Sequence, residues 1–468
     1  GEAYLSEVGS QVYAVGTNGY DITEDVKSRL AARGDQMITN QDIPVPTWFV
    51  NYDAADHSLQ YWKTANDCSP SGTQNADYGT VYVQAGDSDA WQTQYAGPIS
   101  KVAVDSRQSL SGREIHDFLT CYTRYDNTSA YGNALMLRGD YTDVIVNAHK
   151  SPDRYAEQKV TMPDGATATM ICTIVDIEGE PREILFYIPD NASELQPDGA
   201  PVITAWAGGS QTNIIFFDST CWWETANQNG IALIFTNEAY NTSVAVTPAD
   251  VDACYHAMLD LLEGWNDSGK FQFDLSRIYS TGQSMGSMES QQFAQETPDY
   301  YAAVASTSFY QDYPDAHSDK PIPTYLINGE GNGKDDTGTP YDDRWNRTDD
   351  WAQYFLRVNG FVYTPAVYAA DGTVTTFGVP VSEPVFTVTG PYDRFETYTW
   401  INGQDIPLVQ YTNSLYRPHN CLTSEIPMLW DFLEHYRCER DEDGAVTARY
   451  YSASAFERDD QVLIQFGA

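Results

Sequence analysis

Short apolar runs alternate with amphipathic stretches along the chain from about residue 155 onward. The run opened by Thr247-Pro248-Ala249-Asp250 has an N-cap, a first-turn proline and an acid at N3, and its apolar residues then follow the helical period. Buried strands that alternate with such helices predict a parallel sheet covered on both faces. The expected strands are 159–177, 182–190, 201–209, 230–238, 277–282, 302–308, 323–328 and 407–416, and the expected helices are 247–265, 289–297, 349–358 and 424–437. Residues 151–468 are therefore expected to form one α/β domain.

Residues 1–150 contain four runs that return in the same order in the C-terminal half. Pro44, Pro46, Thr47 and Asn51 fall on Pro321, Pro323, Thr324 and Asn328. The pattern indicates a partial α/β half-repeat, and the alternative is two similar strand–helix units that arose independently. The paired runs are IPVPTWFVN (43–51) with KPIPTYLIN (320–328), YWKTAND (61–67) with DWAQYFLRVNG (350–360), VYVQAGD (81–87) with VYAADGT (367–373), and EIHDFL (114–119) with EIPMLWDFL (425–433).

The charge of the chain narrows the classes of partner. Of its 468 residues, 66 are acidic and 26 are basic, which gives a net charge of −40. A field of this sign repels phosphate backbones and anionic lipids, so nucleic acid and membrane surfaces are poor partners. The acidic residues are spread along the chain as a solvated surface, which suits either a salty habitat or a secreted or cell-envelope protein. The polar N-terminus GEAYLSEVGS shows no signal peptide. The seven cysteines form no CxxC pair, so we expect either disulfides with a thiol left over or buried free thiols.

The candidate nucleophile is Ser284 in Gly282-Gln283-Ser284-Met285-Gly286, which fits G-x-S-x-G. The motif lies between the expected strand RIYST and an expected helix that begins near Met288. This strand–turn–helix placement is what a nucleophile elbow requires. The glycines permit a strained backbone that presents the serine hydroxyl at the start of the helix.

Serine is a weak nucleophile and needs a neighbouring base. His419 follows the expected last strand, in the loop Arg417-Pro418-His419-Asn420, where the order serine, acid, histidine places the base. The alternative for His419 is a surface-loop histidine. The other histidines lie in expected helices, in a polar loop or ahead of the catalytic half: His57, His116, His149, His256, His317 and His435.

The loop after the expected strand 323–328 offers the acid of a triad. Asp336 best fits a D-x-x-x-P run that ends at Pro340, Asp335 is the alternative, and Glu330 is third. The oxyanion needs two backbone amides, which are expected from Met285 and from Gly209 or Ser210 in the loop after PVITAW. This chemistry requires no metal and no cofactor.

The stretch from about 180 to 435 resembles the extracellular polyhydroxybutyrate depolymerase and feruloyl-esterase-like group of α/β hydrolases. AGGSQ stands where that family has HGCTQ, and DLSRIYSTGQSMGSM resembles its elbow segment. WWETANQNGIALIFTNE, DVDACYHAMLDLL, DYYAAVASTS, PHN and WDFLEHY match further family segments. The family's oxyanion-loop histidine is Ala207 here, the acid loop is expanded to GEGNGKDD, and 361–400 is long and aromatic. The resemblance implies an α/β-hydrolase fold and carboxylic-ester hydrolysis, without fixing the substrate.

The resulting hypothesis is a secreted serine esterase that works through Ser284, His419 and Asp336, on polyester, phenolic or carbohydrate esters. A serine peptidase or amidase with the same triad is the second hypothesis, and a binding protein on a hydrolase scaffold is the third. Aligning Asp117-Phe118-Leu119 with Asp431-Phe432-Leu433 puts Asp105 opposite His419, so the first copy lacks a base. Residues 1–150 are therefore expected to be non-catalytic and to pack on the catalytic domain or on a second chain.

Overall fold

The structure is a computed structural model. It describes residues 4–8, 11–15, 46–51, 58–66, 68–83, 102–119, 141–162, 164–177, 179–209, 211–236, 248–310, 317–329, 343–363, 367–368, 374–376, 385–389, 395–414, 421–441, 446–455 and 460–467. The chain divides into an N-terminal unit, residues 1–17 and 21–140, and a C-terminal unit, residues 18–20 and 141–468. Helix α5 (Tyr141–Lys150) packs on the first strands of the C-terminal unit, which thus begins before the boundary at 150 that the sequence suggested.

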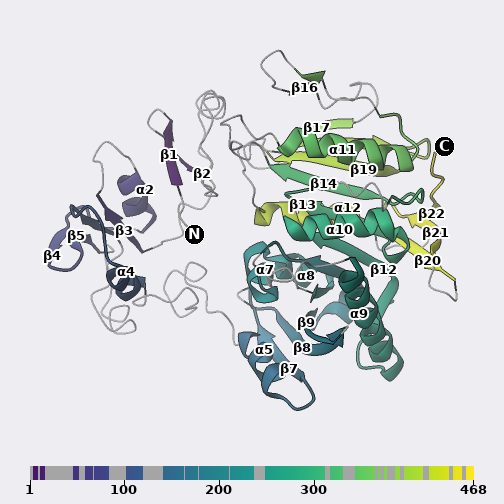
Figure 1. Cartoon of the computed structure of the whole chain (residues 1–468), viewed down its shortest axis with the longest axis horizontal. Coiled ribbons are helices and arrows are strands. Elements are labelled where there is room, and N and C mark those ends of the chain that lie inside the picture. The colour runs from purple at the N-terminus through teal and green to yellow at the C-terminus, as the bar shows by residue number, and fades with distance from the viewer. Residues whose placement is uncertain are drawn as a thin grey trace. The chain divides into compact units, whose positions relative to one another are not determined.

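One large sheet organises the C-terminal unit (Figure 1). Its order among the described strands is β17-β18-β19-β14-β13-β12-β10-β11-β9-β8-β7. The six strands from β19 to β11 are parallel, and the strands on both sides of them pair antiparallel. The strands are β7 (Tyr155–Thr161), β8 (Thr167–Ile177), β9 (Glu180–Pro189), β10 (Ala200–Trp206), β11 (Ala232–Thr236), β12 (Phe273–Gly282), β13 (Ala303–Thr307), β14 (Thr324–Gly329), β17 (Val385–Thr389), β18 (Phe395–Ile401) and β19 (Pro407–Ser414). The predicted parallel sheet is thus the centre of a larger mixed sheet.

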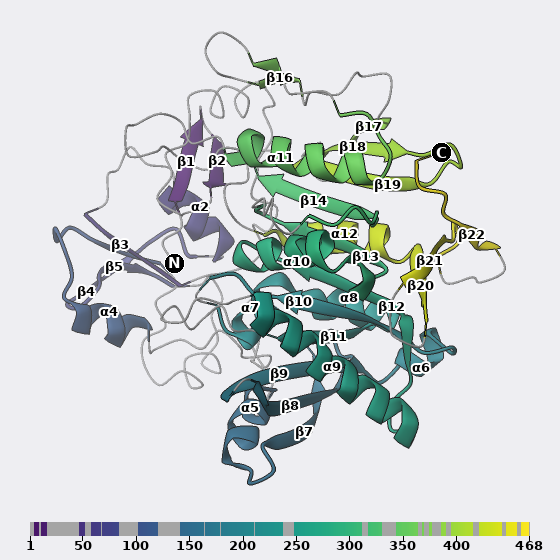
Figure 2. The ribbon, with the colours of Figure 1, turned by 45° about the vertical axis from the view of Figure 1, so that its right-hand side comes forward.

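Helices cover both faces of this sheet (Figure 2). Neighbouring residues of β12 show the two layers, because Tyr279 packs on Trp430 of α12 whereas the Ser280 hydroxyl bonds to Ser290 of α10. Helices α9, α10 and α11 lie together on one face, and α8 contacts α12 on the other. The helices are α6 (Ala192–Leu195), α7 (Asn213–Thr220), α8 (Trp222–Asn229), α9 (Pro248–Ser268), α10 (Met285–Glu296), α11 (Asp343–Val358) and α12 (Ile426–Leu433). The α/β class is confirmed, with the layers expected of an α/β-hydrolase fold.

The end of the chain differs from the prediction. A closing helix was expected over 424–437, but α12 ends at Leu433 and a small antiparallel sheet follows. Tyr436 and Cys438 are buried in alternation with more exposed neighbours, and the Tyr279 hydroxyl donates to the Tyr436 carbonyl at 2.6 Å. Period-two burial and this bond favour a strand over a further helical turn. The sheet consists of β20 (Tyr436–Arg440), β21 (Val446–Tyr451) and β22 (Val462–Leu463).

The N-terminal unit contains a four-stranded sheet in the order β3-β6-β5-β4. These four strands have the same relative directions as β14-β19-β18-β17. The pair β3–β6 is parallel, like β14–β19, and the pairs β6–β5 and β5–β4 are antiparallel, like β19–β18 and β18–β17. Helix α2 follows β3 as α11 follows β14, and α4 follows β6 as α12 follows β19. The elements are β3 (Thr47–Val50), α2 (Ser58–Ala65), β4 (Thr73–Asn75), β5 (Gly79–Tyr82), β6 (Val102–Asp105) and α4 (Gly112–Leu119); β1 (Tyr4–Val8) and β2 (Gln11–Val15) form a separate hairpin.

Two details of the sequence alignment are wrong. VYVQAGD enters β5, whose topological counterpart is β18, whereas VYAADGT enters β15 (Val367–Tyr368), which pairs only with β16 (Val374–Thr376) among the described strands. Asp105 pairs in register with Val50, as Thr412 pairs with Ile327, so Asp105 corresponds to Thr412 rather than to His419. Loops of different length between the last strand and the last helix explain the shift.

The structure describes six of the seven cysteines, for which either disulfides or buried free thiols were expected. Among the described residues, Cys68, Cys172, Cys221, Cys254, Cys421 and Cys438 form no disulfide with one another, and Cys121 lies outside the described residues. Burial raises the pKa of the Cys172 thiol, which keeps it protonated and unreactive. Within the described part of the chain, no helix combines the length and the apolar character needed to cross a membrane.

Candidate active site

Ser284 occupies the turn between β12 and α10, as the motif predicted. Its backbone has φ 59° and ψ −117°, a conformation that a residue with a side chain adopts rarely. Its amide donates to the Thr307 carbonyl of β13 at 3.3 Å, and its carbonyl accepts from the Met288 amide at 3.1 Å. The strained serine is therefore fixed between the adjacent strand and the first turn of α10.

Both glycines of the motif are required by close approach. A Cβ on Gly282 would lie 2.1 Å from the Gly286 carbonyl oxygen, and a Cβ on Gly286 would lie 1.9 Å from the Trp206 carbonyl oxygen. Each obstacle is backbone, which cannot rotate away as a side chain can. The G-x-S-x-G pattern thus allows β12, α10 and the end of β10 to meet at one point.

Near this point lie Met285 and Gly209, two of the residues expected to supply oxyanion donors. Met285 is the first residue of α10, so its amide has no acceptor inside the helix. Gly209 is exposed in the loop after β10, and a Cβ on it would lie 2.8 Å from the Met285 sulfur. The Gly208 amide donates a hydrogen bond to the Gln211 Oε1 at 2.9 Å, which fixes the conformation of this loop. Ser210, the other expected donor, lies outside the described residues.

A buried polar network anchors α10 behind the nucleophile. The Ser287 hydroxyl donates to the Phe309 carbonyl at 2.6 Å, and the Gln291 amide donates to the Ser306 hydroxyl at 2.6 Å. The Gln291 oxygen accepts from the Trp351 indole of α11 at 3.1 Å. Ser287, Ser290, Gln291 and Gln295 are all 0% exposed. Because their hydrogen bonds are directional, these side chains fix the rotation of α10 and hence the orientation of Ser284.

A carboxylate that the sequence analysis did not single out lies beside the elbow. Glu425, in the 3₁₀ turn η5 (Thr423–Glu425) before α12, is 0% exposed. Its Oε2 accepts from the Thr307 hydroxyl at 3.0 Å, and the Thr307 carbonyl is the acceptor for the Ser284 amide. The run EIPMLWDFL predicted a helix start here, but nothing in it signals a partner on β13.

The expected base and acid lie outside the described residues. These are His419, Asp336, Asp335 and Glu330. The chain segments that carry them follow Ser414 at the end of β19 and Gly329 at the end of β14, and these two residues pair in register at the carboxyl edge of the sheet. In the strand order, β14 is the second strand from β12 and β19 is the third. Carboxyl ends of parallel strands are where such folds place their chemistry.

Most other histidines are engaged elsewhere in the described structure. His149 contacts Glu183, His256 contacts the Tyr300 hydroxyl, His317 contacts Gln295, and His435 contacts the Ser452 carbonyl. His116 contacts Asp117 in the N-terminal unit. These contacts agree with the structural roles expected for His256 and His435, and they leave His419 as the preferred candidate for the base.

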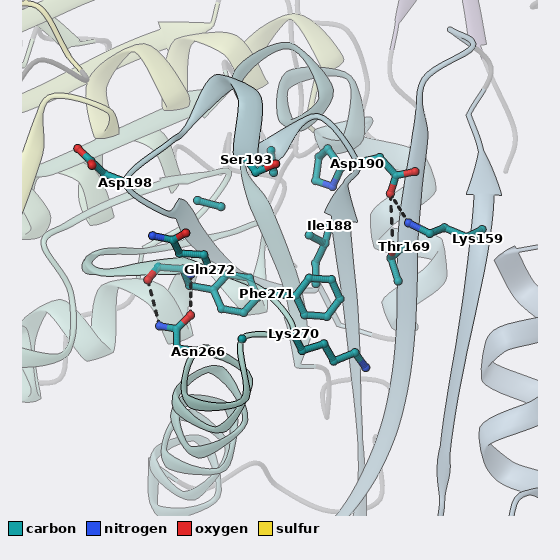
Figure 3. A pocket seen from close by; sticks show the side chains of 15 residues that line it. Lys159, Thr169, Ile188, Asp190, Ser193, Asp198, Asn266, Lys270, Phe271 and Gln272 are labelled. Atoms are coloured by element: carbon teal, nitrogen blue, oxygen red, sulfur yellow. Dashed lines mark hydrogen bonds and ion pairs between the residues drawn. The ribbon is translucent and has the colours of Figure 1, made fainter.

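A cavity of about 680 Å³ lies at the opposite edge of the sheet (Figure 3). It borders Ala200 and Phe273, the first residues of β10 and β12, whereas Ser284 follows the last residue of β12. Its lysines are paired, Lys159 with Asp190 at 2.5 Å and Lys270 with Glu157 at 2.6 Å. This cavity is therefore separate from the nucleophile.

Solved structures with a similar course of chain include several esterases. An acetyl xylan esterase from Aspergillus awamori is 14% identical, with 56% of this chain and 99% of that chain covered and a TM-score of 0.38. An S-formylglutathione hydrolase from Agrobacterium tumefaciens is 11% identical, with coverage of 57% and 92% and a TM-score of 0.33. A ferulic acid esterase is 14% identical, with coverage of 30% and 57% and a TM-score of 0.25. No protein-family profile matches this chain, and no curated protein matches it.

Proposed function

We propose that this protein is a serine carboxylic-ester hydrolase. The observation that carries the proposal is Ser284 at φ 59°, held between β12 and α10 by two glycines that admit no side chain. Strain of this kind costs about 1–3 kcal/mol and persists where it serves a function. A plain strand-to-helix turn would need neither the strained serine nor both glycines, so the geometry favours an enzyme over a binding protein.

In the proposed mechanism Ser284 attacks the ester carbonyl while His419 accepts its proton. Asp336, or Asp335, orients the imidazole and stabilises its protonated form. The amides of Met285 and of Gly209 or Ser210 hold the negative charge on the carbonyl oxygen. The leaving alkoxide takes the proton from His419 and departs as the alcohol. Water then attacks the acyl-enzyme while His419 accepts its proton, and the return of that proton to Ser284 releases the acid and frees the serine.

Matched p-nitrophenyl esters and p-nitroanilides test this proposal. We expect hydrolysis of the esters, loss of that activity in Ser284→Ala, and far slower cleavage of the anilides, whose poorer leaving group demands stronger protonation. Comparable anilide cleavage would favour the peptidase or amidase. Feruloyl esters, acetylated xylan and polyhydroxybutyrate then distinguish phenolic, carbohydrate and polyester substrates, which we propose as the substrate classes of a secreted enzyme.

We also propose that the N-terminal unit is a non-catalytic half-copy of the second half of the hydrolase domain. The shared order and direction of β3-β6-β5-β4 and β14-β19-β18-β17 support this, together with the shared IPVPT and KPIPT runs. A half-sheet must be covered, so we expect it to pack on the C-terminal unit or on a second chain. Residues 141–468 expressed alone should then show altered solubility or substrate preference, and an unchanged enzyme would contradict this role.

A further inference from the structure

The cavity at the amino edge of the large sheet has the size of a ligand site (Figure 3). Its volume of about 680 Å³ falls within the roughly 300–1,000 Å³ typical of small-molecule sites. The end of β9 and helix α6 supply part of its lining, and residues 269–272, which join α9 to β12, supply another part. Elements of the C-terminal unit thus form the cavity, and its lining decides which ligand fits.

The segment 269–272 is held in place by hydrogen bonds at its C-terminal end. Asn266, near the end of α9, accepts from the Phe273 amide at 2.7 Å and donates to the Phe273 carbonyl at 3.1 Å. The Ala200 amide of β10 donates to the Gln272 carbonyl at 2.9 Å. A ligand therefore meets a preformed wall, which lowers the conformational cost of binding.

The charges of the lining favour a neutral ligand. The lining holds two lysines, Lys159 and Lys270, and two aspartates, Asp190 and Asp198, whose formal charges cancel. The Lys159 Nζ lies 2.5 Å from the Asp190 Oδ1, and the Lys270 Nζ lies 2.6 Å from the Glu157 Oε2. An anionic ligand would have to displace these carboxylates, in a chain whose net charge is −40.

An aromatic ring and two uncommitted polar groups belong to the same lining. Phe271 is half-buried and packs on Trp265 and Phe273, with ring centroids 5.6 and 5.9 Å apart, so an aromatic cluster fixes its ring. The exposed side chains of Ser193 and Gln272 make no hydrogen bond within the described part of the chain. A hydroxyl and an amide can each donate and accept hydrogen bonds. The cavity thus combines an apolar ring with groups suited to ligand hydroxyls.

A sugar ring matches this combination. Its faces carry C–H groups that pack on an aromatic ring, and its rim carries hydroxyls that donate and accept hydrogen bonds. An acyl chain would cover the polar side chains without pairing them, which costs binding energy. Resting on the hydrolase function proposed above, we propose that the cavity is a non-catalytic binding site for a neutral oligosaccharide segment, and that a polysaccharide carries the ester substrate.

The distance to the nucleophile determines which substrates benefit from this site. Strand β12 begins at Phe273 in the cavity lining and ends at Gly282, two residues before Ser284. Its 10 residues span roughly 30 Å at about 3.3 Å per residue. A single esterified sugar cannot occupy both places, whereas a chain of several sugar units can. The cavity therefore strengthens the binding of a polymeric substrate through a second contact, and it leaves the hydrolysis of a small ester unaffected.

Isothermal titration calorimetry of the full chain with xylohexaose, cellohexaose and mannohexaose tests the site. These neutral oligosaccharides carry no ester, so hydrolysis does not consume them. We expect at least one to bind, and Phe271→Ala to raise its Kd by roughly tenfold, because the ring that packs on the sugar is lost. Gln272→Ala should raise the Kd by roughly three- to tenfold through the loss of hydrogen bonds.

Two features of the chain keep this test sharp. Gln272 is exposed, so its variant carries the test if Phe271→Ala does not fold. Phe361→Ala, at a half-buried phenyl ring outside the cavity lining, is the matched control and should bind the oligosaccharide as the wild type does.

The acetylated form of the polysaccharide whose hexaose binds tests the link to hydrolysis. Phe271→Ala and Gln272→Ala should raise KM for this polymer by about the factor by which they raise Kd, with kcat unchanged. Both variants should keep the wild-type kcat/KM for p-nitrophenyl acetate, since the cavity lies at the opposite edge of the sheet from Ser284.

Each contrary result has its own meaning. Absence of binding by all three hexaoses, or binding that both variants retain, overturns the saccharide site, and so does binding of inorganic phosphate in place of the hexaoses. Weakened hexaose binding with an unchanged KM for the polymer overturns the role in holding the substrate. Failure of the wild type to hydrolyse p-nitrophenyl acetate would overturn the hydrolase function and this role with it, while the titration still decides the saccharide site.

Discussion

Gly286 and the carbonyl of Trp206 lie so close that a methyl group on Gly286 would stand 1.9 Å from the carbonyl oxygen. Trp206 ends β10 and Gly286 lies in the first turn of α10, so this contact joins the strand that leads to the oxyanion loop with the helix that follows the nucleophile. Neither partner is a side chain that could move. The elbow therefore depends on a glycine here for space.

Gly286→Ala is expected to displace α10 from β10. Overpacking against backbone costs about 3 kcal/mol or more, so the variant should be poorly soluble or inactive. Urea unfolding and ester hydrolysis measure the two effects. Gly264→Ala in α9, where the added Cβ would meet nothing within 4 Å, is the control and should not lower stability. Equal stability of the two variants would contradict the packing argument.

The backbone strain at Ser284 predicts a gain in stability when the nucleophile is replaced by glycine. Glycine adopts a positive φ without the steric cost of a Cβ, whereas alanine retains that cost. Ser284→Gly should therefore be more stable than Ser284→Ala by about 1 kcal/mol, with both variants inactive. Chemical denaturation provides the comparison, and an alanine variant as stable as the glycine variant would show that the turn is unstrained.

The oxyanion assignment predicts different effects of alanine and proline at position 209. A Cβ on Gly209 meets only the flexible Met285 side chain, so Gly209→Ala should fold and keep most of its activity. Gly209→Pro removes the amide and should lower kcat by roughly 100-fold, as loss of one oxyanion donor does. Steady-state kinetics with a p-nitrophenyl ester separates the two. If Gly209→Pro is active and Ser210→Pro is not, the second donor is Ser210.

Glu434 predicts a pH dependence of stability. Burial, reinforced by the charge of Asp431, raises the pKa of Glu434 from 4.5 to about 7. The folded protein thus holds a proton that the unfolded chain releases between pH 4.5 and 7, so this group lowers the free energy of unfolding as pH rises through that range. Because the side chain is only half-buried, we expect the loss to be about 1–2 kcal/mol. Unfolding in urea at pH 5 and pH 8 should show a smaller decrease in Glu434→Gln than in wild type, and equal decreases would exclude this contribution.

The elbow could be predicted from the sequence because its determinants are local. A strand, two glycines and a helix lie within a few residues of Ser284, and the steric need for each glycine follows from the turn. Glu425 could not be predicted in the same way, since its partner Thr307 is distant in the chain and only the sheet brings them together. The polar face of α10 was missed for a related reason, because Ser287 and Gln291 have the pattern of a solvated surface.

The four matched runs of the proposed repeat differ in how well they predict corresponding strands. IPVPT and KPIPT precede or begin two strands that hold similar places in their sheets, β3 and β14, and prolines at the strand start and the strand pattern are shared. The prediction that VYVQAGD and VYAADGT correspond is wrong. The two runs share residue types, but the strands that they enter, β5 and β15, pair with different partners. The three-stranded sheet after α12 was missed because helical propensity runs on through Glu434 and His435, while burial of Tyr436 decides for a strand.

The central claim, that Ser284 is an activated nucleophile, is tested most directly by covalent labelling. The full chain is treated with a fluorophosphonate and the adduct is located by mass spectrometry of the digested protein. We predict one adduct on Ser284, lost in Ser284→Ala and retained in Ser71→Ala, an exposed loop serine in the N-terminal unit. An unlabelled wild-type protein, or labelling that persists in Ser284→Ala, would contradict the account.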